Sequence, residues 1–164
     1  MADAAVLTDD PGAGLTFLTP VLATGGLSNR NTQLLGLTRW NEPPAAATTL
    51  SMQDGIFAAP DPATLSQFEA RYTAIHGGAP HPLAGLAYDG IAAVGAMVKS
   101  AQASGTGALS REQITDPSGF AGVNGVFRFL GNGRNDRGLA LLQLRGGEAV
   151  VIEGAPRSFG GQGS

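Results

Sequence analysis

Short runs of apolar residues alternate along the chain with segments in which apolar side chains recur every three or four positions. Short runs bounded by turn residues are typical of buried strands, whereas the wider spacing is typical of helices. The runs predict strands at Ala4–Leu7, Gln33–Thr38 and Gly55–Ala59. Strands that alternate with helices in this way indicate an α/β fold built on a doubly wound, Rossmann-like parallel sheet.

Two helices are predicted where an aspartate stands directly before a proline. An Asp side chain caps the first turn of a helix, and proline suits its first position. The pair Asp10 and Pro11 begins the first of these helices, and Asp61 and Pro62 begin the second. We expect the second helix to end at Gly77, because glycine readily takes the left-handed conformation of a C-cap.

The rest of the chain contains two more helices and then changes character. A long helix rich in alanine is predicted over Leu83–Ala103, and a short one over Ser110–Thr115, where a capping box fits. Beyond it, alternating apolar residues separated by tight glycine turns are typical of antiparallel hairpins. The predicted hairpin strands are Gly125–Leu130, Leu139–Leu144 and Ala149–Ile152, with a turn at Asn132-Gly133.

The composition excludes several classes of protein. Of the 164 residues, 43% are hydrophobic and 14% are charged, and the net charge is −3. This composition supports a folded core and offers no cluster of basic residues for nucleic acid. No run of 18 apolar residues is present, so the sequence predicts no membrane-spanning helix. Because there are no cysteines, disulfides, thiolate metal sites and a Cys nucleophile are excluded.

The first residues do not match a signal peptide. Met1–Ala5 has no basic segment followed by an apolar one. The first predicted strand begins almost at once. We therefore expect the sequence to be a cut polypeptide rather than one with its natural start.

No catalytic or metal-binding constellation is evident. His76 and His81 flank a Gly-Gly turn, but spacing supplies no third ligand. No Gly-x-Ser-x-Gly elbow and no phosphate-binding loop occur. The sequence therefore predicts neither an enzyme nor a resident metal or cofactor.

Acidic residues at the ends of predicted strands are candidates for ligand binding. Asp9 and Asp10 follow the first strand, and open α/β sheets bind ligands at the carboxyl ends of their strands. Asp10 is better explained as a helix cap, whereas Asp9 is open to a ligand role. Asp54 precedes the third strand, where its carboxylate could hold an ammonium group through a charge-assisted hydrogen bond. The alternative for Asp54 is an exposed loop residue.

Two aromatic residues are further candidates. Trp40 opens an irregular stretch after a strand, so it could line a pocket or pack locally in the core. Tyr88, followed by Asp89, stands early in the long predicted helix and could face a cleft or pack. The sequence leaves both pairs of alternatives open.

Five segments occur in an order that is more specific than any one of them. They are Ala4–Leu7, Asp54–Ile56, Phe68–Tyr72, Ala87–Ile91 and Gly119–Phe129. In this order they resemble the later half of type I periplasmic binding proteins of the leucine/isoleucine/valine-binding type. The resemblance covers about residues 3–153. It implies that residues 1–153 are the C-terminal portion of that fold, and we expect residues 154–164 to be a disordered tail.

The resemblance implies a non-catalytic function. Such proteins have two α/β lobes joined by three crossovers, bind amino acids or related solutes in the cleft, and deliver them to ABC permeases from the periplasm. Asp54 matches an acidic position that often meets the ligand ammonium, whereas Asp9 stands where the family often has an aromatic residue. Since most of the first lobe is absent, we expect this chain alone to bind weakly, unless two chains complete each other, and to self-associate.

A second resemblance implies a different role. The segments Gly36–Trp40, Leu86–Ala93 and Ala155–Phe159 are similar to alphaproteobacterial penicillin-binding protein activators, which share the binding-protein fold. That likeness implies stimulation of a peptidoglycan synthase by protein contact. Solute binding and synthase regulation remain two open hypotheses at this point.

Overall fold

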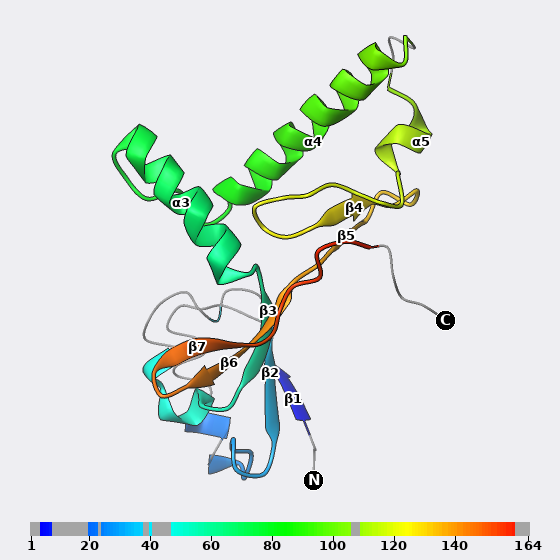
Figure 1. Ribbon diagram of the computed structural model, residues 1–164. Coiled ribbons are helices and arrows are strands. Elements are labelled where there is room, and N and C mark those ends of the chain that lie inside the picture. The colour runs from blue at the N-terminus through cyan, green and yellow to red at the C-terminus, as the bar shows by residue number, and fades with distance from the viewer. Residues whose placement is uncertain are drawn as a thin grey trace. The chain divides into compact units, whose positions relative to one another are not determined.

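The computed structural model describes residues 4–7, 20–22, 24–37, 40, 47–105 and 109–159 (Figure 1). The chain divides into two compact units. Unit 1 comprises residues 1–59 and 140–154, and unit 2 comprises residues 60–139 and 155–164. The chain therefore passes between the units three times, after residues 59, 139 and 154.

Unit 1 is built on a five-stranded sheet in the order β1-β2-β3-β6-β7. The first three strands run parallel, and β6 and β7 are antiparallel to their neighbours. This arrangement confirms the α/β fold class with antiparallel strands at the C-terminal end. The strands are β1 Ala4–Leu7, β2 Gln33–Gly36, β3 Ile56–Ala59, β6 Ala140–Arg145 and β7 Glu148–Glu153, and a 3-10 helix, η1, spans Leu50–Met52.

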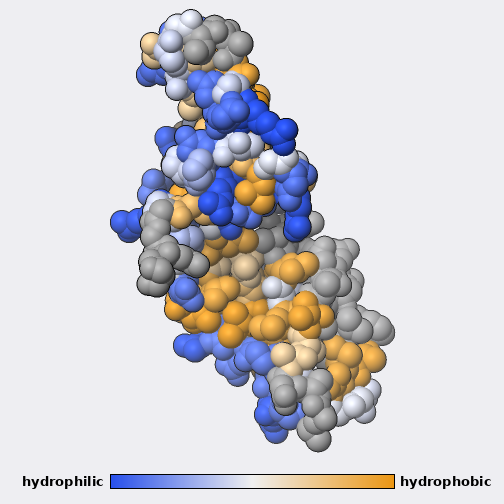
Figure 2. Space-filling view, turned by 90° about the vertical axis from the view of Figure 1, so that its right-hand side faces the viewer, coloured by the Kyte–Doolittle hydropathy of each residue, from blue (hydrophilic) through white to orange (hydrophobic). Residues whose placement is uncertain are grey.

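One face of this sheet is well buried and the other is partly exposed. Phe57 of β3 pairs with Leu142 of β6, and both side chains are 1% exposed. On the opposite face, Val6 is 61% exposed and Val150 38% exposed. Figure 2 shows hydrophobic side chains at the surface in the lower part of the view, at the height at which the strands of unit 1 lie in Figure 1.

Trp40 fills the core under the buried face. Its side chain is 1% exposed, and its ring lies 6.0 Å from that of Phe57. Two glycines make room for it. A Cβ at Gly36 would overlap the indole, and one at Gly55 would lie 2.6 Å from Trp40 Cζ3. Complete burial of a large aromatic side chain is a major part of the stability of such a core.

Unit 2 is mainly helical, with a two-stranded antiparallel sheet, β4-β5. The predicted helix boundaries are confirmed. Asp61 accepts a hydrogen bond from the Ala63 backbone N–H (2.9 Å), and Gly77 has a φ of 76°. The elements are α3 Pro62–His76, α4 Ala84–Ala103, α5 Arg111–Ile114, β4 Phe127–Phe129 and β5 Asn135–Arg137.

The capping box predicted for the short helix α5 is also confirmed. The Ser110 Oγ accepts from the Gln113 backbone N–H (3.2 Å), and the Ser110 N–H donates to the Gln113 side chain (2.9 Å). Both bonds satisfy donors that the first helical turn leaves without a backbone partner.

The hairpin prediction needs one correction. We expected Leu139–Leu144 to follow the Asn132-Gly133 turn as the partner strand, but β5 pairs with β4 instead. The apolar strand β6 belongs to unit 1, where it pairs with β3 and β7. The sequence did not reveal β5 because Asn-Asp-Arg has no apolar residue. The strand forms by pairing with β4, where Arg128 and Asp136 also form an ion pair at 2.9 Å.

Two other expectations fall partly outside the described residues. The first predicted helix, after Asp10 and Pro11, lies mostly there. In the expected disordered tail, the structure describes residues as far as Phe159, whose ring lies 4.6 Å from the guanidinium carbon of Arg128. Residues 160–164 are outside the described part.

Candidate functional site

The sequence-predicted binding residues are divided between the two units. Asp54 and Trp40 belong to unit 1, and Tyr88 belongs to unit 2. Asp9 lies outside the described residues.

Asp54 is an exposed residue with an unusual backbone. Its φ of 63° is the only positive value at a non-glycine position among the described residues. Its N–H donates to the Leu144 carbonyl (2.8 Å), and its carbonyl accepts from the side chains of Gln33 (3.0 Å) and Gln143 (2.9 Å). Within the described part of the chain its carboxylate has no hydrogen-bond partner. Non-glycine residues with positive φ are uncommon, and Asp is among those that tolerate it best.

The position of Asp54 along the sheet weakens the predicted ligand role. It immediately precedes Gly55 and β3, and Gln33, which bonds its carbonyl, is the first residue of β2. Asp54 therefore lies at the amino edge of the parallel strands. Open α/β sheets bind ligands at the carboxyl edge of their strands, which for β1 is the edge at Leu7. In the sequence, Asp9 comes two residues after the end of β1, whereas Asp54 comes two residues before the start of β3.

Trp40 lies in the core of unit 1, as the local-packing alternative expects. At 1% exposure its ring offers no surface for a solute in unit 1 as described. Its indole Nε1 is buried without a hydrogen-bond partner among the described residues.

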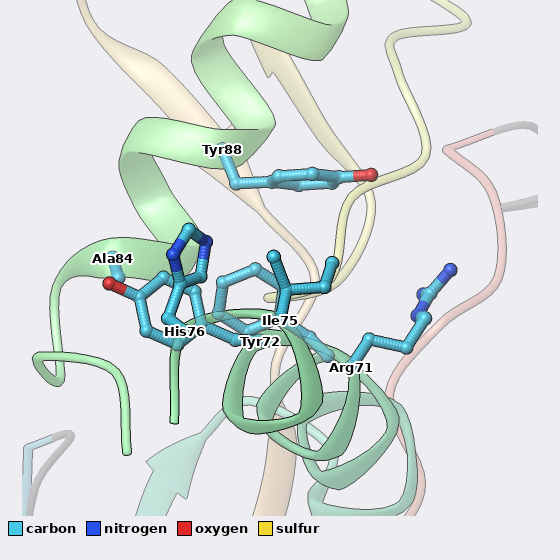
Figure 3. Close-up of a pocket in the computed structure, with 7 residues that line it drawn as sticks. Arg71, Tyr72, Ile75, His76, Ala84 and Tyr88 are labelled. Atoms are coloured by element: carbon cyan, nitrogen blue, oxygen red, sulfur yellow. The ribbon is translucent and has the colours of Figure 1, made fainter. Parts of the chain in front are cut away.

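Tyr88 lines a hollow between α3 and α4 of about 360 Å³ (Figure 3). Small-molecule sites start at about 300 Å³, so this one is at the small end of that range. Its walls are mainly aromatic, and the Tyr88 ring lies 5.3 Å from that of Phe68. The lining residues are Phe68, Arg71, Tyr72, Ile75, His76, Ala84 and Tyr88.

Most of these lining residues were not predicted as site residues. Phe68, Tyr72 and Ile75 recur at helical spacing and form an apolar stripe along α3. Only Phe68 is fully buried, at 7%, whereas Ile75 is 76% exposed. The sequence signal that could have pointed to the hollow is this stripe, since it continues to Ile75, which is exposed in the described part of the chain.

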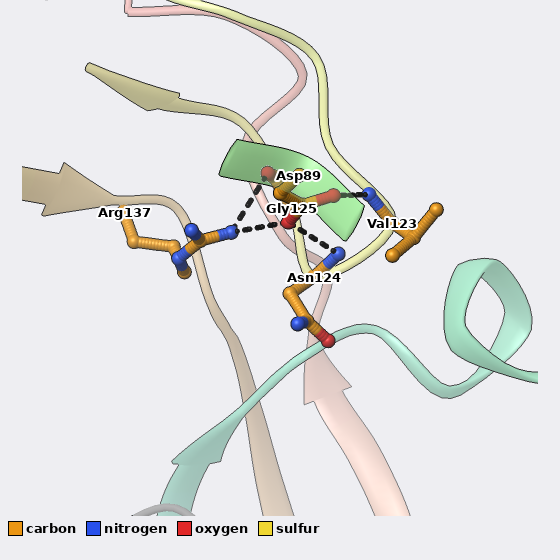
Figure 4. A network of polar contacts seen from close by, with 5 residues as sticks. All are labelled: Asp89, Val123, Asn124, Gly125 and Arg137. Carbon is orange, nitrogen blue, oxygen red and sulfur yellow. Dashed lines mark hydrogen bonds and ion pairs between the residues drawn. The ribbon is translucent and has the colours of Figure 1, made fainter. Parts of the chain in front are cut away.

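Asp89, next to Tyr88, has a structural role (Figure 4). Its side chain is 1% exposed and accepts from the backbone N–H groups of Val123 (2.6 Å) and Asn124 (3.2 Å). It also forms an ion pair with Arg137 Nη1 at 2.8 Å, and the Arg137 guanidinium lies 4.6 Å from the centre of the Phe127 ring. Because these bonds use both carboxylate oxygens, Asp89 fixes the 122–125 loop on α4. Asp89 is therefore packed inside unit 2.

No candidate metal site is present among the described residues. They include no group of three or more His, Asp or Glu side chains that could hold a metal ion. None of the helices that the structure describes is long and apolar enough to cross a membrane.

Comparison with known proteins gives a family and a fold. The model of a family described as periplasmic binding protein matches residues 1–149. No curated protein matches the chain. Among solved structures, a Rhodospirillum rubrum protein described as a branched-chain amino acid ABC transporter matches with a TM-score of 0.63 and 20% identity, over 84% of this chain and 41% of that chain.

Two further structures have the same fold. A leucine-binding protein from Thermotoga maritima matches with a TM-score of 0.56 and 17% identity, over 91% of this chain and 43% of that one. An ABC transporter solute-binding protein from R. palustris, in complex with benzoate, matches with a TM-score of 0.55 and 19% identity, over 95% and 44%. The chain thus spans less than half the length of each.

Proposed function

The chain belongs to the periplasmic binding protein family, and we propose that the whole protein containing it is a non-catalytic, solute-binding component of an ABC transporter. The observation that carries this proposal is the family match over residues 1–149, which runs through both units. The periplasm is the proposed location and an ABC permease the proposed partner.

The proposed ligand is a small organic acid of the amino-acid type. The related structures are described as proteins for branched-chain amino acids and leucine, and one of them holds benzoate. These ligands share a carboxylate and an apolar body. They belong to those proteins, and the likeness in fold supports only the ligand class for this one.

We place the contribution of unit 1 to binding at the carboxyl edge of its parallel strands. In the sequence, Asp9 comes two residues after the end of β1, and a carboxylate at that edge could accept hydrogen bonds from a ligand ammonium. Asp54 is at the other end of the strands and is the less favoured candidate. In unit 2, Tyr88 is the predicted residue that lines a hollow.

A second candidate function is regulation of a peptidoglycan synthase by protein contact. The observation that favours it is the amount of apolar surface exposed on α4, including Ile91 at 76%. Such surfaces commonly mark protein interaction sites. This candidate also rests on the motif likeness of the sequence and requires no solute.

Thermal unfolding of the whole protein in the presence of candidate ligands tests the proposal. The panel contains branched-chain amino acids, benzoate and cell-wall peptides. A ligand present at 100 times its dissociation constant adds about 2.7 kcal/mol to stability. We expect a clear shift with one class of small acid. A shift with none of them would contradict solute binding and favour the regulatory candidate.

Two matched variants locate the site. Asp9→Asn and Asp54→Asn each remove one negative charge and keep the side-chain shape. We expect Asp9→Asn to reduce the ligand-induced shift of an ammonium-bearing ligand and Asp54→Asn to leave it unchanged. The reverse result would restore Asp54 as the ligand contact and contradict placement at the carboxyl edge.

A further inference from the structure

Residues 155–159 leave the sheet of unit 1 and return to unit 2. They follow β7, which ends at Glu153, and they belong to unit 2 by their contacts. None of these five residues lies in a strand or a helix. No strand ladder fastens the segment, so its attachment depends on individual contacts.

Two contacts attach this segment, which we call the clasp, to unit 2. The ring of Pro156 lies against Gly138, where a Cβ would come within 2.6 Å of Pro156 Cγ. The ring of Phe159 lies under the guanidinium of Arg128, whose Cζ is 4.6 Å from the ring centre. A guanidinium at this distance is attracted by the face of an aromatic ring. The clasp therefore lies beside β4 and β5 (Figure 1).

The guanidinium that receives Phe159 is itself held in position. Arg128 Nε and Nη2 both donate to Asp136 Oδ2, at 3.0 and 2.9 Å, across the β4-β5 pair. Arg128 Nη1 donates to the Pro117 carbonyl at 3.4 Å. These bonds use the edge of the guanidinium and leave its flat face for stacking, which is a common use of arginine. Unit 2 thus offers Phe159 a preformed partner.

The connections between the units are short. Residues 60 and 61 separate β3 from α3, and residues 138 and 139 separate β5 from β6. Residues 154 and 155 separate β7 from Pro156, the first attached residue of the clasp. The first two connections join elements of regular secondary structure, whereas the third is complete only while the clasp is attached.

The clasp is attached where the other two connections meet unit 2. Pro156 packs on Gly138, which lies in the second connection. Pro156 also lines a hollow of about 320 Å³ together with Asp61, which lies in the first connection. The three connections therefore enter unit 2 in one region.

We propose that the clasp is a releasable third connection, which limits the relative movement of the two units while it is attached. With the clasp attached, unit 1 is tied to unit 2 at three places, and with it released, at two. Release requires no refolding of either unit, because the clasp has no secondary structure to lose. Loss of one exposed cation–π contact shifts such an equilibrium by about two- to fivefold.

Distances between spin labels in the two units test the proposal in the 164-residue chain. Since the natural chain has no cysteine, the labels are attached at Leu50→Cys in unit 1 and Ile91→Cys in unit 2, which are 84% and 76% exposed. Dilution with unlabelled chain removes distances between molecules. We expect a narrow distribution of distances with the natural clasp. The double variant Pro156→Ala, Phe159→Ala should broaden it.

Single variants identify the cause of the broadening. Phe159→Ala should raise the ratio of released to attached chains about two- to fivefold. Phe159→Trp keeps an aromatic ring for Arg128 and should keep the distribution narrow. Arg157→Ala is the matched control within the clasp, because its side chain is exposed and takes part in neither contact.

Hydrogen exchange of the 119–125 loop, which Asp89 ties to α4, reports whether unit 2 remains folded. If the double variant loses that protection, the comparison of Phe159→Ala with Phe159→Trp decides. The proposal is overturned if the natural chain has as broad a distribution as the clasp variants. It is also overturned if Phe159→Trp or Arg157→Ala broadens the distribution as much as Phe159→Ala.

Discussion

Unit 1 buries its largest side chain under a sheet, whereas unit 2 holds its longest helix with a buried ion pair. In unit 1, Trp40 fits against two glycines and the ring of Phe57. In unit 2, Asp89 ties α4 to Val123 and to Arg137. The contact around Trp40 is one of shape, whereas the contact around Asp89 is a polar one in which both carboxylate oxygens have partners.

The same comparison explains what each unit leaves exposed. The pleat of a sheet sends alternate side chains to opposite faces, so unit 1 exposes residues such as Val150 on its less covered face. A helix buries one stripe of side chains against each element that packs on it. Within the described residues only one side of α4 is covered, so a stripe of its apolar side chains is exposed. Ile91 at 76% exposure is the clearest example.

Removal of the Asp89 carboxylate should have the largest effect. Asp89→Ala leaves Arg137 and two backbone N–H groups without their acceptor, and breaking a buried pair costs about 3–5 kcal/mol. Urea unfolding gives the loss of stability, and hydrogen exchange by mass spectrometry shows whether α4 and the 122–125 loop lose protection. Asp89→Asn keeps the shape and one acceptor, so it should lose less. A change below about 1 kcal/mol for Asp89→Ala would contradict the role of the ion pair.

Crowding of Trp40 should have the next largest effect, in unit 1. The added methyl of Gly36→Ala overlaps the indole, and such overpacking costs about 1–3 kcal/mol. Because Trp40 is the only tryptophan, its fluorescence emission reports the repacking. Gly90→Ala is the control, since a Cβ there meets nothing within 4 Å, and it should stabilise α4 by up to about 1 kcal/mol. Equal losses for both variants would show that packing around Trp40 is not the cause.

Loss of the α5 cap should have a smaller, local effect. Ser110→Ala removes the acceptor for the Gln113 backbone N–H, and such caps are worth about 1 kcal/mol. We expect faster amide exchange in α5 and no change in Trp40 fluorescence. Ser110→Asp, which can still cap, should restore most of the protection. If Ser110→Ala exchanges no faster than the natural chain, the capping box does not hold α5.

The smallest expected effect is a pH dependence in the loop after α5. The Ser118 hydroxyl, and then its backbone N–H, donate to Asp116 and lower the pKa of that carboxyl below its usual value. The stabilisation is therefore present above the ordinary Asp pKa and is lost as the pH falls through the lowered one. Carboxyl carbon NMR should show the pKa of Asp116 rising in Ser118→Ala. An unchanged pKa would rule out the hydroxyl as its cause.

Much of the fold follows from local signals in the sequence. The ends of α3 and the capping box of α5 are each fixed by residues within one turn, so they are predictable. Strand β5 is not, because its three polar residues form a strand only by pairing with β4. The assignment of β6 to unit 1 depends on contacts with β3, far away in the sequence, which an apolar pattern does not reveal.

The candidate site is less predictable than the fold. The sequence selected Asp54 because it stands beside a strand, but it does not show which edge of the sheet that end occupies. For Trp40 the sequence left two alternatives open, the wall of a pocket and the core. The burial of its ring against Gly36 and Gly55 depends on residues that the local pattern does not bring together. The hollow beside Tyr88 depends on the angle at which α3 and α4 pack against each other, and no local pattern in the sequence predicts that angle.

Titration calorimetry of the whole protein with leucine and with benzoate tests the central claim most directly. The account predicts saturable binding of one small organic acid to one site per protein. For leucine, which carries an ammonium group, the affinity should fall in Asp9→Asn and stay the same in Asp54→Asn. Absence of binding heat with both compounds, and with the other acids of the panel, would contradict a solute-binding function.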